Sequence, residues 1–123
     1  MLLIDWWKVV VLRRYTQFVG RAGRAEFWWF ELANLIITVV LSILGRATDV
    51  FNVIGFAYAI AVLVPSVAVG IRRLHDTDRS GWWLLIVLVP LVGVIVLLVF
   101  LASQGTPGPN QYGPPATSDP ALA

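Results

Sequence analysis

Three long apolar stretches dominate the sequence, at positions 27–44, 50–71 and 81–101. A helix needs about 20 consecutive apolar residues to cross the hydrocarbon core of a bilayer, and each stretch is close to that length. The second and third stretches contain no charged residue, and the first contains only Glu31. We therefore predict an all-α integral membrane protein with three transmembrane helices.

The composition supports a membrane protein and excludes several other classes. Apolar residues make up 59% of the chain and charged residues 13%, against about 45–50% and about 25% in soluble domains. Cysteine is absent and His75 is the single histidine, so disulfides, thiolate nucleophiles and the usual zinc sites are excluded. We expect no metal and no cofactor, and we identify no catalytic residue.

The chain divides into three parts. Residues 1–26 form a basic amphipathic segment, residues 27–101 hold the three spans, and residues 102–123 form an irregular tail rich in proline and glycine. In the first part a helix would place Trp6, Trp7 and Val10 on one face, opposite Asp5 and Lys8. We expect this helix to lie in the headgroup region rather than to act as a cleavable signal peptide, and packing on the helix bundle is the alternative.

The distribution of basic residues predicts the orientation. Cytoplasmic segments of inner-membrane proteins carry an excess of lysine and arginine. If the three stretches cross the bilayer, one of the nine basic residues, Arg46, lies on one side. The other eight lie on the opposite side: Lys8, Arg13, Arg14, Arg21, Arg24, Arg72, Arg73 and Arg79. We therefore predict a cytoplasmic N-terminus and an extracytoplasmic C-terminal tail. Three tryptophan pairs, at 6–7, 28–29 and 82–83, fall at the predicted cytoplasmic interface.

Polar residues recur along one face of the first span. Glu31, Asn34, Thr38 and Ser42 are spaced by three or four residues, which aligns them on one helical face. We expect this stripe to form the seam between helices, and a solute path in an oligomer is the alternative. Glu31 and Asn34 are the intramembrane polar candidates, and Glu31 could pair with Arg72 or Arg73 where the second span ends.

The densest group of polar residues is the loop RRLHDTDRSGWW, at positions 72–83. Ser80 is a plausible N-cap for the following helix. His75 and Asp76 could act as an acid–base pair, but no nucleophile accompanies them and one histidine makes a poor metal site. The arginines beside the headgroup layer would suit an anionic lipid, although the orientation rule alone also explains them.

Three segments together resemble a known family. FVGRAGRAEFWWFEL, RRLHDTDRSGWW and GTPGPNQYGP are similar to segments of the domain of unknown function 805 family of bacterial inner-membrane proteins. The resemblance extends from about Trp6 to Pro115, and Asp78 departs from the small residue that is common at that position. It implies a multi-pass inner-membrane protein but no reaction. The family-typical positions are Gly20, Arg21, Arg24, Glu26, Trp28, Arg72, Arg73, Leu74, His75, Asp76, Ser80, Gly81, Trp82, Asn110, Tyr112 and Gly113.

We expect the two charged clusters that flank the spans to meet as one cytoplasmic surface, the polar cap. Its predicted members are Arg21, Arg24, Glu26, Arg72, Arg73, His75, Asp76, Ser80 and Trp82. The function that these observations favour is non-enzymatic binding of anionic lipid headgroups, of a second copy, or of another membrane protein. A small-solute transporter or channel subunit that acts as a homo-oligomer is the second possibility, and a membrane-embedded enzyme the third. No nucleic-acid partner is expected.

Overall fold

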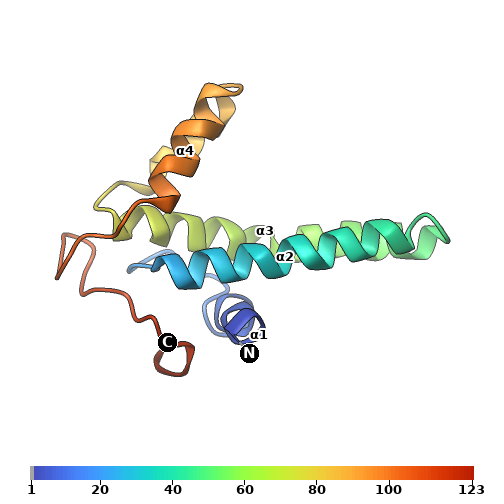
Figure 1. The fold of residues 1–123 in the computed structure, drawn as a ribbon, viewed down its shortest axis with the longest axis horizontal. Coiled ribbons are helices and arrows are strands. Elements are labelled where there is room, and N and C mark those ends of the chain that lie inside the picture. The colour runs from blue at the N-terminus through green and yellow to red at the C-terminus, as the bar shows by residue number, and fades with distance from the viewer. Residues whose placement is uncertain (1) are drawn as a thin grey trace.

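The computed structural model describes residues 2–123, and every regular element in that range is a helix (Figure 1). An isolated bridge between Asn110 and Gly113 is the one strand-like feature there. The elements are α1 (Leu2–Lys8), the π-helical turn η1 (Val9–Arg13), α2 (Arg24–Leu44), α3 (Asp49–Asp76), the 3₁₀ helix η2 (Gly81–Leu88), α4 (Val92–Ala102) and the short η3 (Pro120–Leu122). The all-helical class is as predicted.

Helices α2 and α3 form a long antiparallel pair (Figure 1). Both are apolar and long enough to cross a membrane, with 21 and 28 residues. Thr48 caps α3 by accepting a hydrogen bond from the Val50 N–H. The two helices pack closely at Gly55, where a Cβ would make an ordinary contact of 3.7 Å with the Leu41 Cβ. The first two predicted spans therefore correspond to α2 and α3.

The stretch predicted as the third span does not form one continuous helix. It is divided into η2 and α4, of 8 and 11 residues, and each is too short to cross a bilayer core. Pro90 lacks the N–H that a helix needs. At Leu91 the backbone has φ 64° and ψ −62°, and the Val92 N–H donates to the Pro90 carbonyl over 2.7 Å, which is a γ-turn. The chain reverses here, so η2 and α4 form an apolar hairpin.

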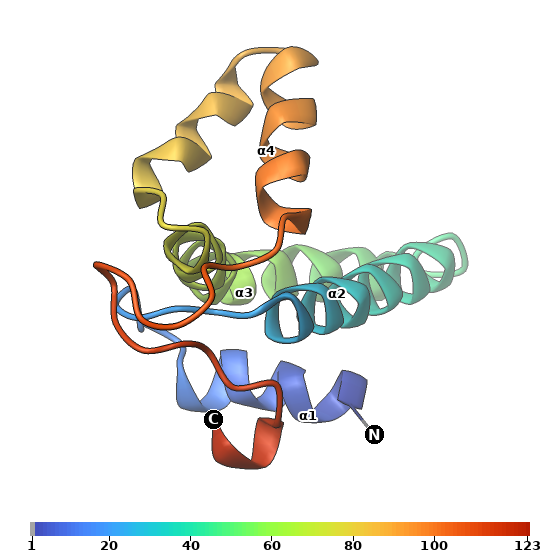
Figure 2. The same ribbon diagram turned by 60° about the vertical axis from the view of Figure 1, so that its left-hand side comes forward.

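The hairpin and α1 lie on opposite sides of the α2–α3 pair (Figure 2). In Figure 1 α1 is seen end-on while α2 and α3 extend across the view, so α1 crosses the pair. The side chains of Trp6 in α1 and Val10 in the adjoining η1 are fully buried, and the Trp7 indole donates to the Tyr58 hydroxyl of α3 over 2.9 Å. In the structure α1 packs on the helix pair, which is the arrangement given above as the alternative to a helix in the headgroup region.

The buried core is concentrated at one end of the molecule, where α2 begins and α3 and α4 end. It combines residues from five parts of the chain: Val10, Ala22, Phe27, Phe30, Val69, Leu74 and Leu101. The rest of the α2–α3 pair is mostly exposed, with large apolar side chains turned outward. In water such a surface would be unfavourable, whereas lipid would cover it.

The tail after α4 returns to this same end, which differs from the prediction. Arg21 of the N-terminal segment donates to the carbonyls of Gly108 and Gly113, and the Thr106 N–H donates to the Asp76 carbonyl over 2.7 Å. A tail on the opposite side of a bilayer from Arg21 could not make these contacts. The difference follows from the reversal at Leu91, because the hairpin leaves and rejoins the fold at the same end.

Candidate functional site

Two buried carboxylates organise the end of the fold where the predicted polar cap lies. Glu26, in the first turn of α2, accepts from Arg14 over 2.8 Å and also pairs with Arg72. The side chains of Glu26 and Arg72 are 1% and 0% exposed. Because a buried charge is costly unless it is paired, each of these groups requires the other.

Asp76, in the last turn of α3, bridges the other two buried arginines. Its Oδ1 accepts from Arg21 Nε over 2.9 Å and its Oδ2 from Arg73 Nη1 over 2.7 Å. Helix α3 continues to Asp76, so His75 and Asp76 belong to this helix and not to the predicted loop at positions 72–83. The longer helix matters, because it places Arg73 and Asp76 three residues apart on one helical face.

Other guanidinium N–H groups of the buried arginines bind backbone carbonyls, whereas Arg72 Nη2 has no hydrogen-bond partner in the described chain. Arg73 donates from Nε to Leu101 over 2.9 Å and also binds the Ser103 carbonyl. Arg72 Nε donates to Gln17 over 2.9 Å, and Arg21 Nη2 donates to Thr106 over 2.6 Å. The arginines therefore fix the N-terminal segment and the tail against the end of α3. We call this set of six charged residues the ion-pair network: Arg14, Arg21, Glu26, Arg72, Arg73 and Asp76.

His75 holds the tail in a different way. Its Nδ1 lies 3.0 Å from the Gly20 carbonyl oxygen, and its ring stacks on Tyr112 with centroids 3.9 Å apart. Asn110 donates to the His75 carbonyl over 2.9 Å and accepts from the Tyr112 N–H over 2.8 Å. No group of three or more potential metal-ligating side chains occurs within residues 2–123. One ring nitrogen and one ring face of His75 thus make structural contacts.

Two glycines are favoured here, one by close packing and the other by its backbone conformation. A Cβ on Gly105 would lie 2.0 Å from Asp76 Oδ2, so a side chain would displace the carboxylate. Gly20 has φ +95°, a conformation that residues with a side chain rarely adopt, and its carbonyl faces His75. These two glycines thus allow the backbone to lie close to the ion-pair network and to His75.

The predicted residues of the polar cap separate into two groups. The structure brings Arg21, Glu26, Arg72, Arg73, His75 and Asp76 together. Arg24 is exposed and in none of the ion pairs of the described chain. Ser80 caps η2 by accepting from the Trp82 N–H over 3.3 Å, and the Trp82 side chain is 78% exposed. Sequence reasoning missed Arg14 and the carbonyls of the tail.

The two intramembrane candidates have different surroundings. Asn34 accepts from the Tyr58 hydroxyl over 2.5 Å, which extends the Trp7–Tyr58 contact into a chain that joins three helices. Glu31 makes no ion pair or hydrogen bond within the described chain. The expected pairing of Glu31 with Arg72 or Arg73 is therefore wrong. Glu26 and Asp76 lie at the level of these arginines, whereas Glu31 lies more than one helical turn beyond Glu26.

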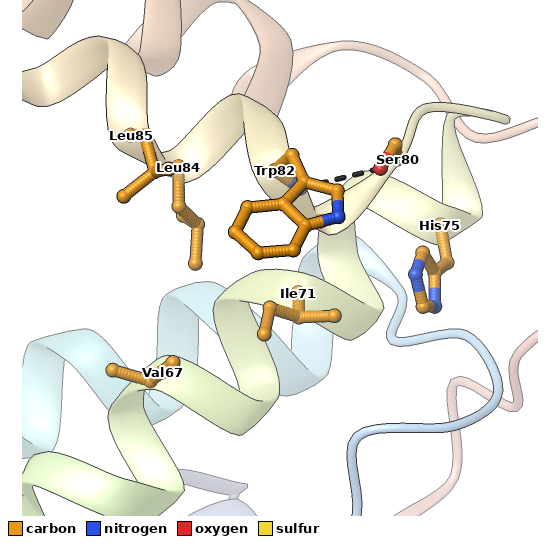
Figure 3. A pocket seen from close by; sticks show the side chains of 8 residues that line it. Val67, Ile71, His75, Ser80, Trp82, Leu84 and Leu85 are labelled. Atoms are coloured by element: carbon orange, nitrogen blue, oxygen red, sulfur yellow. Dashed lines mark hydrogen bonds between the residues drawn. The ribbon is translucent and has the colours of Figure 1, made fainter.

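A cleft of about 410 Å³ lies between α3 and η2, next to the polar cap (Figure 3). Val67 and Ile71 of α3 lie across from Leu84 of η2 and give the cleft an apolar wall. His75 and Ser80 provide polar groups among the lining residues. The structure thus contains an apolar cleft with polar groups on the cap side, separate from the buried ion pairs.

Comparison with known proteins gives the family. The chain is 42% identical to the inner membrane protein YhaH of Escherichia coli strain K12, over 95% of this chain and 100% of that protein. It is 43% identical to the inner membrane protein YhaI of the same strain, over 87% of this chain and 92% of that protein. These relatives support the bacterial inner membrane as the location. No solved structure matches the chain.

A family model described as a protein of unknown function, DUF805, matches residues 15–114. This range includes the ion-pair network except Arg14, the hairpin, and the tail up to the stacked Tyr112. The chain belongs to the DUF805 family.

Proposed function

We propose that this chain is a non-enzymatic inner-membrane protein that binds an anionic phospholipid in the cleft between α3 and η2. The observation that carries the proposal is the composition of this cleft. Its apolar wall suits an acyl chain, and the Ser80 hydroxyl can donate a hydrogen bond to a phosphate on the side of the cleft where His75 lies. The Ser80 hydroxyl accepts from the Trp82 N–H, which leaves its own O–H to donate.

The proposed topology follows from the two long helices. Helices α2 and α3 cross the bilayer, and residues 45–48 join them on its extracytoplasmic side. The segment before α2, the loop 77–80 and the tail all face the cytoplasm, because most basic residues lie there. The hairpin of η2 and α4 then lies within the cytoplasmic leaflet, where lipid covers side chains such as Leu88 and Leu91, both 74% exposed.

The role proposed for the buried arginines is structural rather than lipid binding. Arg72 and Arg73 are 0% exposed, and their charges are matched by Glu26 and Asp76. A phosphate could reach them only by breaking buried ion pairs. Arg79, next to Ser80 in the chain, is a better candidate for a headgroup, since its guanidinium lies over the Phe100 ring at 4.0 Å and forms no ion pair in the described chain.

Lipid retention tests this proposal. Full-length protein would be purified in detergent, mixed with phosphatidylglycerol and phosphatidylcholine in equal amounts, and examined by native mass spectrometry. We expect wild-type protein to retain phosphatidylglycerol preferentially. Val67→Trp should fill the cleft and reduce this retention by about tenfold, a loss of about 1.4 kcal/mol.

Leu35→Trp is the matched control, because Leu35 is 59% exposed on α2 and does not line the cleft. It should retain phosphatidylglycerol as wild type does. Equal retention of the two lipids by wild type would refute the preference. Unchanged retention in Val67→Trp would show that lipid binds elsewhere.

A further inference from the structure

Glu31 differs from the other acidic residues near the cap. Glu26 and Asp76 each bind two arginines, whereas Glu31 has no ion pair or hydrogen bond with any residue in the range 2–123. It lies inside the first predicted span, where an acidic residue is unfavourable and marks a candidate functional position.

The Glu31 side chain lines an open pocket of about 300 Å³ formed by α2, α3 and the hairpin. The walls are mainly apolar: Phe27, Trp28, Leu84, Leu98 and Leu101. Glu31 is the one ionisable residue among those that line it. The pocket shares Leu84 alone with the proposed lipid cleft. The two sites are therefore distinct, and this inference does not depend on the proposed function.

The chemistry of this pocket selects one kind of ligand. An anion would be repelled by the carboxylate, and a neutral apolar molecule would remove water from it without providing a partner. A protonated amine would form a charge-assisted hydrogen bond with Glu31. The indole of Trp28 would add a favourable contact with the cation, because the face of an aromatic ring attracts positive charge.

We propose that this pocket binds a protonated amine carried on a compact apolar body, with the ammonium group on Glu31 and the apolar body against Phe27, Leu98 and Leu101. The ligand enters from the bilayer, since Trp28 is 37% exposed at the side of the pocket. The charge of the ligand, in addition to its hydrophobicity, determines the affinity.

Binding of 1-aminoadamantane tests the proposal, and 1-adamantanol serves as the uncharged analogue. Titration calorimetry would use the full chain in maltoside micelles, which carry no charge, with empty micelles as the blank. We expect saturable binding of the amine to wild type and binding at least about tenfold weaker for the alcohol. Glu31→Gln should weaken amine binding by a similar factor.

Asp49→Asn is the matched control, because it also converts a carboxylate to an amide but lies in the first turn of α3, outside the pocket. It should bind the amine as wild type does. Ser66→Phe fills the pocket while leaving Glu31 intact, so it should abolish binding and tests the site even if Glu31→Gln folds poorly. Absence of saturable amine binding by wild type, equal binding of amine and alcohol, or wild-type affinity in Glu31→Gln or Ser66→Phe would each overturn the proposal.

Discussion

Replacing Glu26 by glutamine should destabilise the fold strongly, because it removes the partner of a buried cation. Glu26 binds Arg72, whose side chain is 0% exposed, and Arg14, whose side chain is 17% exposed. Hydrogen bonds to charged groups contribute about 1.5–3 kcal/mol each. Removing one partner of a buried ion pair costs about 3–5 kcal/mol.

These magnitudes agree, and we expect Glu26→Gln to lower the free energy of unfolding by about 3–5 kcal/mol. The Nη2 of Arg72 is already a buried donor with no hydrogen-bond partner in the described chain. The variant would thus leave the guanidinium bound chiefly through Nε to the Gln17 carbonyl. Asp49→Asn, at an exposed carboxylate, should cost less than about 1 kcal/mol.

The assay is reversible denaturant unfolding in mixed micelles, followed by tryptophan fluorescence. The double variant Glu26→Gln, Arg72→Met should lose less stability than the sum of the two single variants, because it removes both charges together. If Glu26→Gln unfolds within about 1 kcal/mol of wild type, or if the two changes are additive, the buried pair does not hold the fold as described here.

Two further predictions concern single positions. Gly105→Ala should lower the melting temperature far more than Gly23→Ala. A Cβ on Gly105 would lie 2.0 Å from Asp76 Oδ2, whereas the nearest atom to a Cβ on Gly23 is at 3.6 Å. Equal melting temperatures of the two variants would argue against the contact between the tail and α3. Leu91→Gly should stabilise the protein or leave it unchanged, because Leu91 has φ 64° in the turn after Pro90. In a continuous third helix the same change would lower the free energy of unfolding by about 1 kcal/mol, so a loss of that size would contradict the turn at Leu91.

Sequence patterns predicted the two long helices because their apolar runs are long and end at charged or turn residues. They could not predict the reversal at Leu91. A uniformly apolar segment has no periodicity that separates a spanning helix from a hairpin, and Pro90 is compatible with a kink as well as with a break. The prediction that the tail is extracytoplasmic depended on counting this segment as a third span.

The members of the polar cap could be identified from charge and spacing, but their pairing could not. Glu26 and Glu31 both lie near the start of α2. Glu26 is the one that pairs with Arg72, because the folded helices place Arg72 of α3 beside Glu26. The contacts of the tail with the buried arginines could not be predicted from the sequence either. Arg21 and Arg73 recognise the tail through backbone carbonyls, which every residue carries.

The most direct test of the account is the side of the membrane on which the tail lies. The chain contains no cysteine, so single cysteines can be introduced at Thr16, Ala47 and Ser118 and labelled with a membrane-impermeant maleimide in spheroplasts. We predict that Ala47→Cys is labelled in intact spheroplasts, and that Thr16→Cys and Ser118→Cys are labelled only after the membrane is permeabilised. Labelling of Ser118→Cys in intact spheroplasts, with Thr16→Cys still protected, would contradict it and would restore a third membrane span.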